Sequence, residues 1–358
     1  MSFRNILFIT LSIMLVISLA ACSTENEDVV PDESLETEET DVTLEESLVI
    51  YSTHSEEMLE VIAEGFTEKT GVRVDFINLK GELADRVRAE KASPQADIMY
   101  GGPSSLYIEM TKEDLFEAVE TTWEPELDPM YKDSAFKWYG VMLTPVTIFY
   151  NSEAISAEDA PNSWADLADP KYQGMVISRD YLSSSQRAVI CALLDYYSRN
   201  YSFDEGIDYL KRLDSNTKNY YGSGSLHLQA VGKQEAPISY ALISVITDNV
   251  INNNMPLKIV DPEEGTIVLT DGIAVIKNGP NPNAAKAFLE YAGSEEVQLK
   301  LANEFNRMPT IESILNNCPE WMQIPFKTMD VDWENIAENE LDWLNLWDTE
   351  IRDSSRDI

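Results

Sequence analysis

The region from residue 48 to residue 105 alternates short apolar segments with amphipathic segments, and this alternation restricts the fold more than any other feature. Leu48-Val49-Ile50-Tyr51 predicts a strand, and the next segment repeats apolar residues at helical spacing up to Gly71. Strands are predicted again over 72–77 and 96–100, with a helix that starts near Gly81 between them. A strand-helix-strand-helix-strand order predicts a parallel sheet with helices on both faces.

The length of the chain predicts two lobes. About 310 of its 358 residues follow the first 47, and this exceeds the usual size of a single hydrophobic core. Strand signals recur over 141–151 and 267–277, and Asp271-Gly272 within the second of these predicts a bulge or turn. The predicted fold class is therefore α/β.

The first residues have the features of a signal peptide. Arg4 gives a positive start, and residues 6–19 form an apolar run too short to span a bilayer with ease. Leu19-Ala20-Ala21-Cys22 resembles the lipobox of bacterial lipoproteins, and this resemblance implies removal of residues 1–21 and lipidation of Cys22. The alternatives are an ordinary secretory signal cleaved near Ala21 and an uncleaved helix.

The segment that follows is strongly acidic. Eleven carboxylates and no lysine or arginine lie between Ser23 and Ser47, so the segment cannot bury enough apolar surface to order itself. We expect residues 22–47 to form a disordered tether that holds the folded body away from a lipid surface.

The charge and cysteine content exclude several classes of function. A formal net charge of −37 argues against a nucleic-acid partner, which needs clustered lysine and arginine. Cys191 lies in an apolar helical run and is predicted to be a buried thiol, and no cysteine or histidine spacing indicates a metal site. The sequence has no GxSxG, HExxH or Walker motif, so no enzymatic activity and no cofactor are expected.

Candidate ligand contacts lie where strands lead into helices, because parallel strands place such loops at one edge of a sheet. The loops are 52–55, 80–82 and 101–105, and helix starts there offer free N–H groups to an anion or a polar oxygen. The alternative is that their serines only cap helices. The candidates in these loops are Ser52, Thr53, His54, Gly101, Gly102 and Ser104.

Two further segments add candidates. Residues 178–185 follow the predicted strand 175–177, and Arg179 there can donate bidentate hydrogen bonds to a phosphate or carboxylate. Residues 220–227 form a glycine- and serine-rich stretch that resembles a phosphate cradle but also suits a plain connection. The candidates here, with three from elsewhere in the chain, are Arg179, Ser184, Ser185, Gly222, Ser223, Ser225, His227, Thr144, Tyr240 and Asp271.

Several segments together resemble one family. LVIYSTHSEEMLEVIAEGF, GVMLTPVTIFYNSE, SWADLADPKYQGMV and NRMPT, in this order and spacing, are similar to type II periplasmic-binding proteins of ABC importers. The branch is that of ferric-ion, aminoethylphosphonate and sugar-phosphate receptors, and the likeness covers almost the whole body from Leu48. It implies a two-lobed fold with a hinge and an interlobe ligand cleft. Lobe 1 would comprise residues 48–140 and 261–310, and lobe 2 residues 141–260 and 311–358.

The resemblance implies a receptor that captures a small solute by lobe closure and delivers it to a membrane permease. We expect a monomer, lipid-anchored on the extracytoplasmic face of the membrane. The favoured solute is anionic, a phosphonate or phosphorylated compound. The alternatives are a ferric-iron receptor and a ligand sensor for a membrane kinase.

The iron alternative can be compared residue by residue. The resemblance implies adjacent iron-binding tyrosines just after the strand at 236–242, a histidine in the first loop and a glutamate after the third strand. Here the histidine is present as His54, but Ile243-Ser244 stands at the tyrosine position and no acid follows Tyr100. The pair Tyr220-Tyr221 falls about two dozen residues too early. Therefore no metal is expected at the site.

Overall fold

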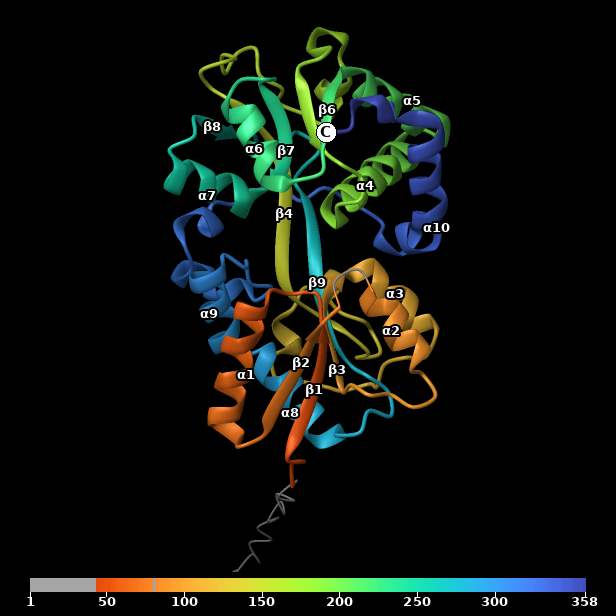
Figure 1. The fold of residues 1–358 in the computed structure, drawn as a ribbon, viewed down its shortest axis with the longest axis vertical. Helices are drawn as coiled ribbons and strands as arrows, with labels where there is room; N and C mark the ends of the chain where they lie inside the picture. The colour runs from red at the N-terminus through yellow and green to blue at the C-terminus, as the bar shows by residue number, and fades with distance from the viewer. Residues whose placement is uncertain (1–42, 80–81) are drawn as a thin grey trace, which may run out of the picture. The chain divides into compact units, whose positions relative to one another are not determined.

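One mixed sheet forms the centre of the computed structural model, which describes residues 43–79 and 82–358 (Figure 1). Eight of its nine strands follow the order β2-β1-β3-β9-β4-β7-β5-β6, and the ninth, β8, pairs with β4. The strands are β1 (Ser47–Ser52), β2 (Arg73–Asn78), β3 (Ile98–Pro103), β4 (Tyr139–Asn151), β5 (Val176–Arg179), β6 (Thr217–Tyr221), β7 (Ile238–Leu242), β8 (Leu257–Ile259) and β9 (Ile267–Val275).

Helices cover both faces of this sheet. The α-helices are α1 (Glu56–Thr70), α2 (Leu83–Ala89), α3 (Ser104–Lys112), α4 (Ser184–Asn200), α5 (Phe203–Asn216), α6 (Gly224–Gly232), α7 (Ile243–Asn253), α8 (Pro282–Ala292), α9 (Glu295–Phe305) and α10 (Trp333–Leu346). Short 3-10 helices are η2 (Glu124–Glu126), η3 (Pro129–Tyr131), η4 (Ala165–Ala168), η5 (Pro170–Tyr172), η6 (Glu312–Asn317), η7 (Glu320–Gln323) and η9 (Ser354–Arg356), and η8 (Trp347–Ile351) is a π-helical turn.

The predicted parallel arrangement of the first three strands is confirmed, since β1 pairs in parallel with both β2 and β3. The sheet as a whole is mixed, because β9 runs antiparallel to β3 and to β4. The register between β4 and β9 shifts opposite Asp271 and Gly272, where the sequence predicts a bulge or turn. This irregularity bends the sheet beside the cleft described below.

The first lobe is defined here as the elements β1–β3, α1–α3, α8 and α9. Apolar residues of α1, α8 and α9 pack on one face of its strands, and those of α2 and α3 pack on the other (Figure 1). α1 buries Met58, Leu59, Ile62 and Phe66, which recur at helical spacing on one side. It ends as predicted at Gly71, whose N–H donates to the Thr67 carbonyl and whose φ of 77° turns the chain out of the helix.

The second lobe is defined here as β5–β8, α4–α7 and α10. One cluster surrounds α4, α5 and α10, and another lies under α6 and α7. Cys191 of α4 is fully buried and has a free thiol, as predicted, and burial raises its pKa. β4 and β9 take part in both lobes, so they are the strands that connect them (Figure 1).

The sequence prediction places the segment 311–358 in the second lobe, but part of it packs on the first lobe. Ile311 and Ile314 join the first-lobe cluster around β1 and β3. Gln298 of α9 holds this region in place, because its side-chain oxygen accepts hydrogen bonds from the N–H groups of Thr310 and Ile311. The described residues form a single compact unit, and the other predicted lobe boundaries stay predictions.

The predicted signal peptide, the lipidated Cys22 and most of the predicted tether lie outside the described residues. The last tether residues differ from the expected disorder. The Glu45 carboxylate accepts a hydrogen bond of 2.7 Å from the N–H of Ala284 at the start of α8, and Ser47 already belongs to β1. Within residues 43–79 and 82–358, no helix is long and apolar enough to cross a membrane.

Candidate ligand-binding cleft

A cavity of about 610 Å³ lies between loops of the first lobe and helices of the second. The loops that follow β1 and β3 line one side, and the start of α4 lines the other. Trp333, Ile336 and Glu340 of α10 complete the lining. The sequence prediction that strand-to-helix loops meet at a cleft is consistent with this arrangement.

A smaller pocket of about 90 Å³ adjoins the cleft within the second lobe. Arg179, Gln186, His227 and Tyr240 contribute its polar groups. Ser185 and Leu242 line both cavities, so the two cavities are neighbours.

Ten of the sequence-predicted residues are brought to these two cavities. Thr53, His54, Gly102, Thr144, Ser184, Ser185 and Asp271 line the cleft, while Arg179, His227 and Tyr240 line the smaller pocket.

The remaining predicted residues line neither cavity, and hydrogen bonding explains two of them. The Ser52 hydroxyl is fully buried and donates to the carbonyl of Tyr100. Ser223 caps α6, since its side-chain oxygen accepts from the N–H of Leu226. The capping alternative therefore holds for Ser223. The others outside both linings are Gly101, Ser104, Gly222 and Ser225.

His227 and Tyr240 are largely committed to the protein. The His227 ring nitrogen Nε2 lies 2.5 Å from the Ser239 hydroxyl, and burial lowers the histidine pKa to about 3. The Tyr240 hydroxyl lies 2.8 Å from Ser178 and accepts from Gln186 at 2.7 Å. Both side chains shape the pocket floor more than they offer free hydrogen bonds.

Three helices that begin at the cleft share an unusual feature. The starts of α3, α4 and α7 have neither a side-chain N-cap hydrogen bond nor an acidic residue in the first turn. Each other α-helix of the described residues has a compensating group, either a first-turn acid, an N-cap side chain or, for α8, Glu45. Since free N–H groups at a helix start attract negative charge, these three starts favour an anion in the cleft.

Arg307 is the main cleft residue that the sequence prediction missed. It follows α9, directly after Asn306, whose φ of 54° ends that helix. Its side chain lines the cleft and forms no ion pair within the described residues, and its buried Nε has no hydrogen-bond partner. Its only sequence signal is its position in the NRMPT segment.

Arg179 lies on the opposite lobe and, like Arg307, forms no ion pair with a described residue. Its Nη2 donates to the carbonyl of Gly222 at 3.2 Å, and its Nε has no partner among the described residues. Burial lowers the pKa of Arg179, and neighbouring Asp180 opposes this shift. The guanidinium is therefore incompletely satisfied by the protein itself.

Buried polar groups surround Arg307 on the first-lobe side. His54 is 5% exposed, its ring packs edge-on against Tyr100 at 4.8 Å, and burial together with Arg307 lowers its pKa to about 3. Burial raises the pKa of Asp271 to about 6, with Arg307 opposing the shift. Burial also raises the pKa of Tyr100, whose hydroxyl has no partner in the structure. The histidine is neutral and the phenol protonated at neutral pH.

The tyrosine pair Tyr220-Tyr221 does not reach the cleft. Tyr220 donates to the Asp214 carboxylate at 2.7 Å and Tyr221 to Glu235 at 2.6 Å, and neither side chain lines a cavity described above. Among the residues that the structure describes, no three histidine, cysteine, aspartate or glutamate side chains are grouped to hold a metal ion.

α10 contributes a further wall of the cleft. Trp343 of α10 and Trp347 of η8 are buried in the core, whereas Trp333 lines the cleft. Glu340 also lines the cleft and pairs with Arg187 of α4 at 3.5 Å. Glu338 forms an ion pair of 2.7 Å with Lys112 of α3, so α10 also contacts the first lobe.

Comparison with known proteins yields consistent matches. Residues 93–339 match a family model described as bacterial extracellular solute-binding protein. A probable ABC transporter periplasmic-binding protein of Sinorhizobium fredii is 27% identical over 321 residues, which cover 86% of this chain and 87% of that protein. Other curated relatives, from Serratia marcescens and Neisseria meningitidis among others, are named as ferric-iron-binding proteins.

Solved structures extend this likeness. Apo ferric ion-binding protein A of Pasteurella haemolytica has a TM-score of 0.76 at 22% identity, and the match covers 87% of this chain and 100% of that one. The periplasmic binding protein AfuA of Actinobacillus pleuropneumoniae, solved with fructose-6-phosphate bound, has a TM-score of 0.70 at 25% identity, covering 86% and 99%.

Proposed function

The chain belongs to the bacterial extracellular solute-binding proteins, and we propose that its solute is a small organic anion with a phosphate or phosphonate group. Membership confirms the predicted type II periplasmic-binding fold and the role as the solute receptor of an ABC importer. It also confirms that the protein is a receptor and not an enzyme.

The observation that carries the proposed solute is the pair of arginines that face the cavities from the two lobes. Arg307 and Arg179 form no ion pair within the described residues, although the chain has 63 acidic residues and 26 basic ones. Both guanidinium groups are partly buried, and a charged group removed from water without an ion pair costs free energy. An anionic solute between the lobes would form ion pairs with both side chains and would favour lobe closure.

The uncapped starts of α3, α4 and α7 support the same class of solute. A phosphate or phosphonate presents three oxygens, which can accept hydrogen bonds from several directions at once. N–H groups from three helix starts and two guanidinium groups approach the cavities from different elements. A planar carboxylate, with two oxygens, would satisfy fewer of these donors.

The size of the cleft favours an organic compound over an inorganic ion. A volume of about 610 Å³ lies within the range of small-molecule sites. Trp333 and Ile336 offer apolar surface for the uncharged part of the solute. Fructose-6-phosphate, bound in the solved AfuA structure, is therefore a suitable first probe.

Ferric iron is the second candidate, favoured by the names of several relatives and by the cleft position of His54. The residues of this chain favour it less. Ile243 and Ser244 begin α7 at the position of the iron-binding tyrosines, and an arginine instead faces His54. A cation in this place would be repelled by Arg307.

We also propose that Cys22 carries a lipid that anchors the receptor outside the cytoplasm. The lipobox at residues 19–22 supports this proposal. Metabolic labelling with a radioactive fatty acid tests it, since label should appear on the protein and be lost in Cys22→Ser. Equal labelling of the variant would contradict the anchor.

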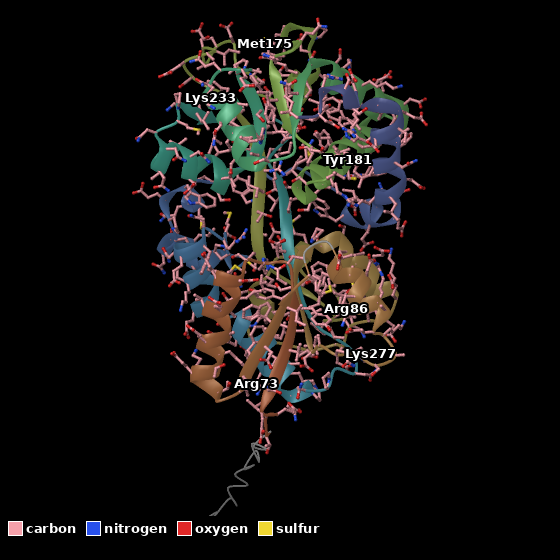
Figure 2. All side chains as sticks on the ribbon, in the orientation of Figure 1. Arg73, Arg86, Met175, Tyr181, Lys233 and Lys277 are labelled. Carbon is pink, nitrogen blue, oxygen red and sulfur yellow. The ribbon has the colours of Figure 1, made fainter. Side chains whose placement is uncertain are left out.

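The test of the proposed solute is titration calorimetry on the chain from Ser23 onward, which keeps every described residue. Fructose-6-phosphate should bind, and Arg307→Ala should lose about 2–4 kcal/mol, roughly 30- to 1000-fold in affinity. Arg73→Ala is the matched control, because Arg73 pairs with Asp75 on the exposed far end of the first lobe (Figure 2).

Ferric salts form the second arm of this experiment. Ferric binding with a visible phenolate charge-transfer band, and no heat with any phosphorylated or phosphonate compound, would contradict the proposed solute and favour iron.

A further inference from the structure

We propose that the segment 348–358, which comprises most of η8 and the residues after it, positions Arg179 for solute binding by holding the two loops beside it. The inference rests on the role proposed above for Arg179. The loops are 180–183, between β5 and α4, and 222–223, between β6 and α6. The segment lies beyond residues 93–339, which match the family model.

The segment extends the sheet next to β6, which is the last strand in the sheet order. The N–H of Ile358 donates to the carbonyl of Tyr220 at 2.7 Å, and the N–H of Gly222 donates to the carbonyl of Ile358 at 3.0 Å. Asp357 forms a parallel bridge with Tyr220. The backbone on both sides of Tyr221 is therefore fixed by the segment.

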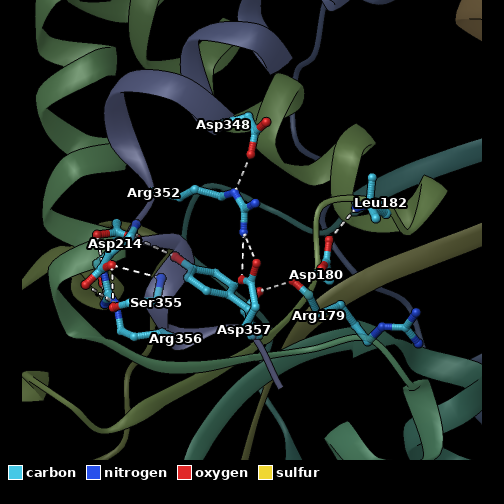
Figure 3. A network of polar contacts seen from close by, with 12 residues as sticks. Arg179, Asp180, Leu182, Asp214, Asp348, Arg352, Ser355, Arg356 and Asp357 are labelled. Atoms are coloured by element: carbon cyan, nitrogen blue, oxygen red, sulfur yellow. Dashed lines mark hydrogen bonds and ion pairs between the residues drawn. The ribbon is translucent and has the colours of Figure 1, made fainter.

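Arg352 holds the other loop. Its guanidinium lies 4.6 Å from the centre of the Tyr181 ring, which allows a cation-π interaction. The same guanidinium bonds Asp348 at 2.7 Å and Asp357 at 2.6 Å (Figure 3). The Arg352 side chain is only 9% exposed, while its two carboxylate partners are about a third exposed, so the ion pairs are partly screened by water. One side chain thus connects Tyr181 to the residue that pairs with β6.

The buried carboxylate of Asp214 attaches the segment to the second lobe. Asp214 accepts hydrogen bonds from the Tyr220 hydroxyl at 2.7 Å and from the N–H of Asp353 at 3.1 Å. It also pairs with Arg356 (Figure 3). Since Asp214 belongs to α5, the segment is attached to the core of the second lobe and not only to the loops.

The two loops in turn determine where Arg179 lies. The N–H of Asp180 donates to the carbonyl of Tyr221 at 3.0 Å, which joins the loops directly. The Arg179 Nη2 donates to the carbonyl of Gly222 at 3.2 Å, while the guanidinium extends away from the network of Arg352 and Asp357 (Figure 3). The segment therefore acts on Arg179 through Gly222 and does not touch the solute.

A pair of variants at one position separates the backbone contact from side-chain effects. Ile358→Pro removes the N–H that donates to Tyr220, and Ile358→Ala keeps it. The Ile358 side chain is 61% exposed, and Asp357 has φ −70° and ψ 132°, which suit a residue before proline. Neither substitution should disturb the core.

The first readout needs no solute. Hydrogen exchange at the amide of Asp180 reports the contact between the loops, and it should be about fivefold faster in Ile358→Pro than in Ile358→Ala, as expected for one lost hydrogen bond. The amide of Leu79, which donates to Ser52 in the first lobe, should be unchanged. Equal exchange at Asp180 in the two variants would overturn the inference.

The second readout is affinity for fructose-6-phosphate in a double-mutant cycle with Arg179→Ala. Ile358→Pro should weaken binding about fivefold when Arg179 is present and should have no effect when Arg179 is alanine. The same loss in both backgrounds would show a merely structural role and would overturn the inference alone. Unchanged affinity in Arg179→Ala by itself would refute the proposed role of Arg179, and this inference with it.

Discussion

Gly224 stands at the first position of α6 and lines the smaller pocket together with Arg179, and its substitution tests whether that arginine is placed for binding. A Cβ atom at residue 224 would lie 2.5 Å from the Arg179 Nη1. An ordinary contact of a Cβ atom needs at least 3.4 Å, so Gly224→Ala should displace the guanidinium by about 1 Å. The hydrogen bond of 3.2 Å to the Gly222 carbonyl would then be lost.

We expect Gly224→Ala to weaken solute binding without lowering the stability of the folded protein. Loss of one well-placed charged hydrogen bond costs about 1.5–3 kcal/mol, or roughly 10- to 150-fold in affinity. The folded protein should not suffer, because the displaced atoms end a flexible side chain and alanine favours a helix over glycine by up to about 1 kcal/mol. Calorimetry with fructose-6-phosphate and thermal unfolding measure the two quantities.

Gly222→Ala is the matched control in the same loop, since its Cβ would meet nothing closer than the Ile358 carbonyl oxygen at 3.7 Å. It should bind the solute like the native protein. Native affinity in Gly224→Ala, alongside weakened binding in Arg179→Ala, would refute the reasoning that the position of the guanidinium matters.

Two further predictions concern pH, each followed by urea unfolding of the ligand-free protein. The pKa of His54 is lowered to about 3 in the folded state, so below pH 6.5 the unfolded chain binds a proton that the folded protein does not, and stability falls on acidification. His54→Gln should remove up to about 3 kcal/mol of the loss between pH 7 and pH 4; an unchanged pH slope would contradict this. The pKa of Asp271 is raised to about 6, so the folded state holds the extra proton between about pH 4 and 6, and stability falls as pH rises through that window. Asp271→Asn should therefore be more stable than the native protein at pH 8, by up to about 3 kcal/mol, and a less stable variant would show that the carboxylate is better compensated than its burial indicates.

The sequence predicted those parts of the site that local signals determine. Thr53 and Ser184 come directly before or within a helix start that follows a parallel strand, so their position at the cleft follows from the strand-helix order. The same signal cannot separate a ligand contact from a cap, and Ser223 is a cap. Local pattern thus located the loops better than it identified the side chains that face the solute.

Residues that reach the cleft through long-range packing were not predictable in this way. Arg307 follows a helix of the first lobe and Trp333 begins a helix that packs between the lobes, and neither lies in a strand-to-helix loop. The antiparallel β9 was likewise recognisable as a strand but not as the partner of both β3 and β4. Such pairings depend on the path of the whole chain.

The most direct measurement of the central claim is a crystal structure of the chain from Ser23 grown with fructose-6-phosphate. We predict that the phosphate lies in the cleft, with oxygens about 2.7–3.2 Å from the Arg307 guanidinium and from N–H groups at the start of α3 or α4. A cleft that holds a ferric ion bound by tyrosine oxygens, or a phosphate bound away from Arg307, would contradict the proposed site.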